Sequence, residues 1–172
     1  MTSYLRDNLV AGLRTSPFRA PWKAWALVPV LAILAAAIGF GAGLLEVEWL
    51  DSPLAPLLPI TLFVFPSLLE EAFFRGVLIP RNVLDCGAPR VAVATSTVAF
   101  VAWHPVNALA FNHAAIPLFL DPWFLLIVAA LGITCGCGYV LSRSLWVPVL
   151  IHWVAVVVWV LFLGGRNLLL EM

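Results

Sequence analysis

Apolar residues form five long runs along the chain, and short polar stretches separate them. An α-helix needs ~20 apolar residues, at a rise of about 1.5 Å per residue, to cross the hydrocarbon core of a bilayer. Five such helices are therefore predicted, at residues 24–45, 54–79, 91–111, 122–141 and 145–163. This pattern predicts an all-α, polytopic membrane helix bundle. No repeat or linker divides the chain, so we expect a single membrane domain over residues 1–172.

The composition indicates the same class of protein. The chain is 63% hydrophobic and 10% charged, whereas soluble proteins are about 45–50% apolar and about 25% charged. We therefore expect an integral membrane protein with the lipid bilayer as its surroundings. The formal net charge is zero, which gives no indication of a nucleic-acid partner. The cysteines form neither a disulfide framework nor a four-ligand zinc pattern, and we interpret them as small apolar fillers: Cys86, Cys135 and Cys137.

The basic residues predict an orientation, because cytoplasmic loops are enriched in Lys and Arg. With a cytoplasmic N-terminus, seven of the nine basic residues lie on that side, Arg75 lies within a span, and only Arg166 lies opposite. We therefore expect a plasma-membrane protein with its N-terminus in the cytoplasm and its C-terminus outside. The segment before Lys23 is basic, and we expect it to form a helix on the membrane surface. The first apolar run is long enough to remain as an anchor, so we expect no cleavable signal peptide.

A few strongly polar residues interrupt the predicted spans. A charge at the middle of a bilayer costs ~2.5–3.5 kcal/mol on insertion scales, so these residues need a structural or functional reason. An internal salt bridge and two core histidines explain part of the set. The residues are Glu70, Glu71 and Arg75 in the second span, His104 and Asn107 in the third, and His152 in the fifth.

Helical geometry separates the two glutamates. Glu71 and Arg75 are four residues apart, with the acid on the N-terminal side, which is the better order for an ion pair on one helix face. Glu70 is turned by ~100° from Glu71, so it has no partner on its own helix. From the predicted cytoplasmic ends of their spans, Glu70, His104 and His152 lie at depths of ~13, ~20 and ~10 Å. The three side chains therefore share one half of the membrane and are predicted to converge on one site.

A carboxylate and two imidazoles permit two kinds of chemistry. The carboxylate can take a proton from water while an imidazole orients or stabilises what forms. The same three groups can also ligate a metal such as zinc, although the helical zinc motif H-E-x-x-H is absent from the chain. We therefore expect no cofactor, with a divalent metal as the less favoured alternative.

Three motifs resemble those of the CPBP family, which comprises CAAX proteases and bacteriocin-processing enzymes and is also called the Abi family. The first, E-E-x-x-x-R, is present as EEAFFR, and the second, F-x-x-x-H, as FVAWH. The third begins with a histidine, here in HWVAV from His152 to Val156. The motifs occur in order on separate predicted spans, and the resemblance covers roughly residues 54–163, the expected catalytic core.

This resemblance implies an intramembrane endopeptidase that cleaves a membrane-associated protein or peptide near its C-terminus. By similarity, Glu70 is the general base that activates water, with His104 and His152 beside it. Glu71 and Arg75 are then expected to hold the helix geometry. A glutamate mechanism without metal is preferred for the better-studied members, and we adopt it as the expectation.

The chain departs from the family at Val156, where Asn or Asp is frequent and helps to hold the oxyanion. Asn107 lies three residues after His104 on much the same helix face, so its carboxamide is a candidate replacement; the alternative is that it caps or packs. Val156 also favours a second hypothesis, a non-catalytic membrane protein of the same fold that binds peptides or acts in bacteriocin immunity. A small transporter or channel is a third hypothesis, which the lack of visible inverted repeats disfavours.

Other residues have structural interpretations. Pro66 and Pro105 are predicted to kink their helices or to be tolerated there. Trp103 and Trp153, each next to a candidate histidine, are expected to pack in the core or at the interface. Asp121 is expected to start a helix. Two pairs of glycines at four-residue spacing are expected to let helices approach closely: Gly39 with Gly43, and Gly132 with Gly136.

Overall fold

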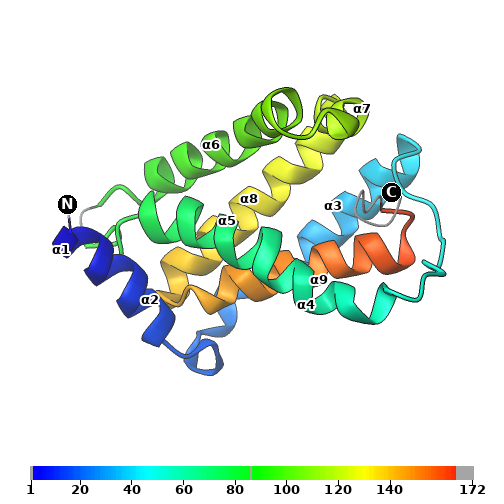
Figure 1. The fold of residues 1–172 in the computed structure, drawn as a ribbon. Coiled ribbons are helices and arrows are strands. Elements are labelled where there is room, and N and C mark those ends of the chain that lie inside the picture. Colours follow the sequence, from blue (N-terminus) through cyan, green and yellow to red (C-terminus); the bar gives the residue numbers. More distant parts are fainter. Residues whose placement is uncertain (1, 86, 166–172) are drawn as a thin grey trace.

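A computed structural model describes residues 2–85 and 87–165, and every regular element in these residues is helical. The interpretations of Cys86 and Arg166 fall outside the described residues. Figure 1 shows the arrangement of the helices. In chain order they are α1 (Thr2–Leu5), α2 (Ala11–Arg14), α3 (Val28–Gly41), α4 (Leu58–Leu62), α5 (Leu69–Glu71), α6 (Pro89–Ala110), α7 (Ile116–Phe119), α8 (Pro122–Ser142) and α9 (Trp146–Phe162).

The predicted all-α membrane class is confirmed. Among the described residues, three helical segments are long and apolar enough to cross a membrane: Trp22–Gly41, Ala55–Val77 and Pro122–Ser142. The other two predicted spans are also helices, α6 with 22 residues and α9 with 17. Helix α9 is apolar but shorter than the others. That α6 and α9 cross the membrane stays a prediction.

Helix α8 is central to the bundle, because it packs against α3, α6 and α9 (Figure 1). Its start follows the sequence prediction: Asp121 accepts hydrogen bonds from the backbone N–H groups of Trp123 and Phe124, at 2.8 and 3.0 Å. Such an N-cap satisfies donors that the first turn of a helix leaves unpaired. The cap fixes where α8 begins, and α8 in turn supports the helices that carry the site.

Close approach of α6 to α8 depends on two glycines. A Cβ at Gly132 would lie 3.0 Å from the Thr97 side chain, and one at Gly136 would lie 3.0 Å from the Val93 side chain. The expectation for this pair is confirmed. The expectation for the other pair is wrong at Gly43, which has open space around it and a φ of +69°. Gly43 serves the turn after α3, where a positive φ favours glycine.

The segment Ala55–Val77 breaks once. Phe65 has extended backbone angles, φ −133° and ψ 120°, immediately before Pro66. Proline has no N–H to continue the helical ladder, so the predicted kink at this position is confirmed. The chain then resumes as a helix that carries both glutamates. In contrast, α6 continues as one helix through Pro105 to Ala110.

The N-terminal helix, residues 2–14, lies against the ends of two helices that carry the site (Figure 1). Asn8 donates from Nδ2 to the Ile79 carbonyl at 3.2 Å and accepts from the Arg81 N–H at 3.3 Å. The Leu145 N–H, just before α9, donates to the Gly12 carbonyl at 3.1 Å. One face of this predicted surface helix therefore contacts protein.

Candidate active site

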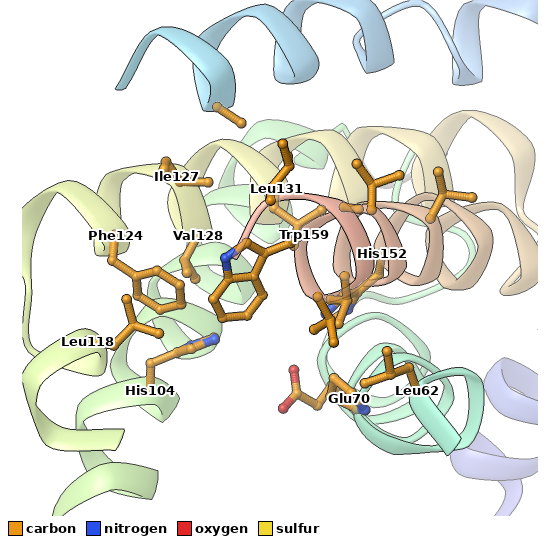
Figure 2. A pocket seen from close by; sticks show the side chains of 18 of the residues that line it. Leu62, Glu70, His104, Leu118, Phe124, Ile127, Val128, Leu131, His152 and Trp159 are labelled. Atoms are coloured by element: carbon orange, nitrogen blue, oxygen red, sulfur yellow. The ribbon is translucent and has the colours of Figure 1, made fainter. Parts of the chain in front are cut away.

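The bundle encloses a cavity of about 1320 Å³ between α3, the kinked segment, α6, α8 and α9. Most of its lining is apolar, and its polar lining includes Glu70, His104, Asn107 and His152. Figure 2 shows Glu70 and His104 extending toward each other from different helices, with His152 on α9. The structure therefore brings these four predicted site residues to the wall of one cavity, whereas Glu71 and Arg75 are buried behind it.

Glu70 carries the carboxylate that faces this cavity. Its Oε1 accepts a hydrogen bond from the indole N–H of Trp103 at 3.2 Å. Its Oε2 is buried and has no hydrogen-bond partner among the described residues. In this part of the chain Glu70 also has no salt bridge. As predicted, this carboxylate has no partner on its own helix.

Glu71, the adjacent acid, is held from two sides. Its Oε2 lies 3.0 Å from Nε of Arg75, and both side chains are fully buried. Its Oε1 accepts a hydrogen bond from Nδ1 of His152 at 2.9 Å. The predicted pair of Glu71 and Arg75 is confirmed. The hydrogen bond from His152 goes to Glu71 rather than to Glu70, and Nε2 of His152 is left as the ring nitrogen available to the cavity.

Arg75 joins the glutamate helix to the rest of the bundle. Its Nη2 donates to the Gly132 carbonyl on α8 at 3.1 Å. Its guanidinium carbon lies 4.5 Å from the ring centroid of Phe100 on α6, within the range of a cation–π interaction. Beside it, the Ser96 hydroxyl donates to the Phe74 carbonyl at 2.7 Å. These contacts fix the rotation of the glutamate helix against α6 and α8.

Phe100, the aromatic residue of the F-x-x-x-H motif, lies between the two histidines. Its ring centroid is 5.1 Å from that of His104 and 5.7 Å from that of His152, edge-to-face in both cases. The side chain is fully buried. An aromatic ring of this size holds the imidazoles apart and restricts their rotation.

His104 has one ring nitrogen committed to the backbone. Its Nδ1 donates to the Phe100 carbonyl, one turn earlier on α6, at 3.0 Å. The ring also packs against Phe119 and Phe124, with centroid distances of 5.0 and 5.8 Å. A carbonyl can only accept, so Nδ1 carries the proton and Nε2 is left free in the neutral ring. Figure 2 shows this ring directed toward the cavity.

Asn107 and Val156 also line the cavity. The backbone carbonyl of Asn107 ends α6 by accepting from the N–H groups of Phe111 and Asn112, both at 2.9 Å. Its side chain, which is half-buried, makes no hydrogen bond to the described residues. Val156 supplies no polar atom, whereas two carboxamide residues, Asn107 and Asn112, are among the described residues that line the cavity.

Sequence reasoning missed the contact made by Trp103, which was expected to pack. The sequence did indicate that Trp103 needs a hydrogen-bond acceptor, because an indole N–H within an apolar span is seldom left unpaired. Trp153 does pack, and its N–H donates to the Pro59 carbonyl at 2.7 Å. Trp159, which no motif marked, also lines the cavity (Figure 2).

Among the described residues, no group of three His, Cys, Asp or Glu side chains is arranged to hold a metal ion.

The apolar helices and this cluster of acids and imidazoles at a cavity define a helical integral membrane protein with a polar site. A sequence model of the type II CAAX prenyl endopeptidase Rce1-like family matches residues 51–158, more than half of the chain. The chain therefore belongs to the Rce1-like family, as its motifs indicated. No curated protein matches it. No solved structure matches it either.

Proposed function

We propose that this protein is an intramembrane endopeptidase in which Glu70 activates a water molecule to hydrolyse a peptide bond. The observation that carries the proposal is the environment of Glu70. Its carboxylate lines a cavity that two imidazoles also line, and no basic side chain of the described residues forms a salt bridge with it. A carboxylate fully neutralised by a cation makes a poor base, and here that arrangement belongs to Glu71.

The proposed reaction assigns one role to each group. Glu70 takes a proton from water, and Nε2 of His104 accepts a hydrogen bond from the same water. The hydroxide attacks the substrate carbonyl and a tetrahedral oxyanion forms. His152, which Glu71 holds through Nδ1, donates from Nε2 to this oxyanion. Glu70 then passes its proton to the leaving amine as the C–N bond breaks.

Glu71 and Arg75 support this reaction without touching the substrate. The carboxylate of Glu71 accepts a hydrogen bond from Nδ1 of His152 and so fixes the orientation of its ring. Arg75 balances the charge of Glu71 in a dry environment and ties the helix to α8. We therefore assign Glu71 and Arg75 to positioning, and Glu70, His104 and His152 to catalysis.

Asn107 is proposed as the second oxyanion donor, in place of the Asn or Asp that Val156 replaces. Its side chain lies at the cavity wall beside the His104 turn. Loss of one oxyanion donor costs roughly 10²–10³-fold in kcat, and we expect Asn107→Ala to fall in this range. Unchanged turnover in this variant would remove Asn107 from the mechanism.

The proposed substrate is a membrane-associated protein or peptide that is cleaved near its C-terminus. The cavity is lined mainly by apolar side chains and lies inside an apolar helix bundle, so an extended apolar segment fits it better than a charged one. We also propose that the N-terminus is cytoplasmic and the C-terminus external, in the plasma membrane, because the basic residues are distributed that way. Reporter fusions at each terminus test this orientation.

The central test replaces the proposed base in purified protein. Glu70→Gln keeps the shape of the side chain and removes its ability to take a proton. With a quenched fluorogenic peptide that has apolar C-terminal residues, we expect the rate to fall by at least about 10²-fold. The matched control is Glu48→Gln, an exposed acid outside the cavity, which should retain the wild-type rate. Cleavage by Glu70→Gln at the normal rate would exclude Glu70 as the base.

The mechanism needs no metal, and the same assay tests this point. Activity should persist after dialysis against a strong chelator. Loss of cleavage on chelation, followed by recovery with zinc, would replace the glutamate mechanism by a metal-dependent one at the same residues.

A non-catalytic role in peptide binding or bacteriocin immunity is the second candidate function. Val156 favours it, because the chain lacks the polar residue that the third motif often provides. The Glu70→Ala variant separates the two functions in cells: retained protection by this variant would indicate binding, whereas lost protection together with lost cleavage would indicate catalysis.

A further inference from the structure

We propose that Trp103 is the positioning residue of Glu70, whose carboxylate it orients for the attack on water. The inference rests on the proposed function, because it assigns a partner to the proposed base. Its evidence is one contact: the indole Nε1–H donates to Oε1 of Glu70 at 3.2 Å. Both side chains line the cavity. A single fixed donor on one oxygen leaves the other oxygen, Oε2, as the atom without a protein partner among the described residues.

The chemical nature of the donor suits a base. Glu71 is held by Arg75 and His152, a guanidinium and an imidazole, which balance its negative charge. Glu70 is held by an indole, which donates one hydrogen bond and stays neutral because it does not ionise near neutral pH. An indole therefore restricts the rotation of the carboxylate without pairing it with a formal charge. The two adjacent acids thus have partners that suit different tasks.

The position of Trp103 in the chain couples the base to its imidazole. Trp103 and His104 are consecutive on α6, and consecutive helical residues project ~100° apart. One helix therefore places the donor on Glu70 and, beside it, the ring that faces the same cavity. The indole ring of Trp103 also packs against Phe111, with centroids 6.1 Å apart, which limits its own movement. A rotation of α6 would displace both groups together.

A substitution that keeps the ring and removes the N–H tests the role. In Trp103→Phe we expect kcat on the fluorogenic peptide to fall roughly ten- to hundred-fold with KM nearly unchanged, because a misplaced catalytic group costs about this much. The matched control is Trp153→Phe. Like Trp103, Trp153 lies within a helix next to a candidate histidine and donates its indole N–H. Its acceptor, however, is the Pro59 carbonyl and not a carboxylate. This control should keep the wild-type kcat.

A spectroscopic measurement tests the contact without using activity. In a proton–nitrogen spectrum of ¹⁵N-tryptophan-labelled protein in detergent, the indole signal that disappears in Trp103→Phe identifies Trp103. We expect this signal to move upfield in Glu70→Gln, because its acceptor loses its charge, while the Trp153 signal stays in place. A Trp103 signal that does not respond, or a Trp103→Phe variant with the wild-type kcat, overturns the inference.

The same set of variants keeps this inference separate from the proposed function. Full cleavage by Glu70→Gln together with a shifted Trp103 signal would reject Glu70 as the base and, with it, a catalytic use of the contact. Lost cleavage by Glu70→Gln together with wild-type kcat in Trp103→Phe would leave the proposed function intact and reject the role of Trp103.

Discussion

At the scale of single residues, neighbouring positions in the chain have opposite surroundings. Glu71 lies in a closed ion-pair cluster with Arg75 and His152, whereas Glu70 meets an indole and a cavity. The difference follows from the ~100° turn between consecutive helical residues, which directs one acid to the core and the other to the cavity wall. In the buried cluster, Arg75 balances the negative charge of Glu71.

Because Glu71 and Arg75 form a buried ion pair, we predict that removal of the Arg75 cation strongly lowers the free energy of unfolding. Arg75→Met keeps much of the side-chain volume but leaves Glu71 without its guanidinium in a fully buried place. Removal of one partner from a buried ion pair costs about 3–5 kcal/mol, and we expect a loss of this size in the free energy of unfolding. Equilibrium unfolding in mixed micelles measures it.

The chain offers a matched control for this measurement. Arg143 pairs with Asp85 at 3.3 Å, but the two side chains are 43% and 66% exposed. Exposed pairs contribute about 0–1 kcal/mol, so Arg143→Met should change the unfolding free energy little. Equal losses in the two variants would contradict the interpretation that burial makes the Arg75 pair important.

How far residue-level contacts can be predicted from sequence depends on whether they lie within one helix. The pair of Glu71 and Arg75 is four residues apart, so helical periodicity was sufficient to predict it. The contact of Trp103 with Glu70 joins two helices, and so does that of His152 with Glu71. Both depend on the rotation of each helix about its axis, which packing against several neighbours determines. Spacing alone therefore predicted the contact within one helix but not the contacts between helices.

At the scale of elements, the contact between α6 and α8 positions half of the site. Helix α6 carries Trp103 and His104, and it approaches α8 through Gly132. The Gly132 carbonyl also accepts from Arg75. This crossing therefore holds the imidazole helix and the glutamate helix against the same part of α8.

Gly132→Ala is expected to disturb this crossing. The added methyl group would lie 3.0 Å from the Thr97 side chain and 3.3 Å from the Phe100 side chain, so these two side chains must move by a few tenths of an ångström. Overpacking of this kind costs about 1–3 kcal/mol, and cleavage should fall as well because Phe100 contacts both histidines. Thermal unfolding and peptide cleavage measure the two effects. Gly41→Ala is the control: it has open space around it at the end of α3, and a decrease similar to that of Gly132→Ala would argue against a role for close packing.

The elements themselves follow from the apolar pattern, because length and hydropathy determine where a helix can cross a membrane. The helix α8, predicted at residues 122–141, is found at Pro122–Ser142. The break at Phe65 was predicted only through Pro66. The role of Gly43 was not predictable from its four-residue spacing to Gly39. Helix α3 ends at Gly41, so Gly43 lies beyond it, and spacing does not indicate where a helix ends.

At the scale of the whole molecule, the N-terminal helix joins the ends of two site helices although it precedes the region that matches the family, residues 51–158. Asn8 bonds the chain just after the glutamate helix. At its other end, the carbonyl of Thr15 accepts from Ser144 at 2.6 Å and that of Leu13 accepts from Trp146 at 2.7 Å. The helix therefore links the end of the segment with Glu70 to the start of α9, which carries His152.

Asn8→Ala tests whether this link holds the two ends together. Asn8 is 6% exposed, so its loss leaves the Ile79 carbonyl and the Arg81 N–H without partners in a poorly hydrated place. A buried polar group without a partner costs about 1–3 kcal/mol, and we expect a destabilisation of this order. Hydrogen exchange should report faster exchange at Arg81, whose N–H loses its acceptor, and at Leu145 if the whole helix loosens. Asn82→Ala, at an exposed site in the same loop, should leave both amides unchanged. Unaltered exchange at Arg81 in Asn8→Ala would show that the N-terminal helix is not what fixes this end of the site.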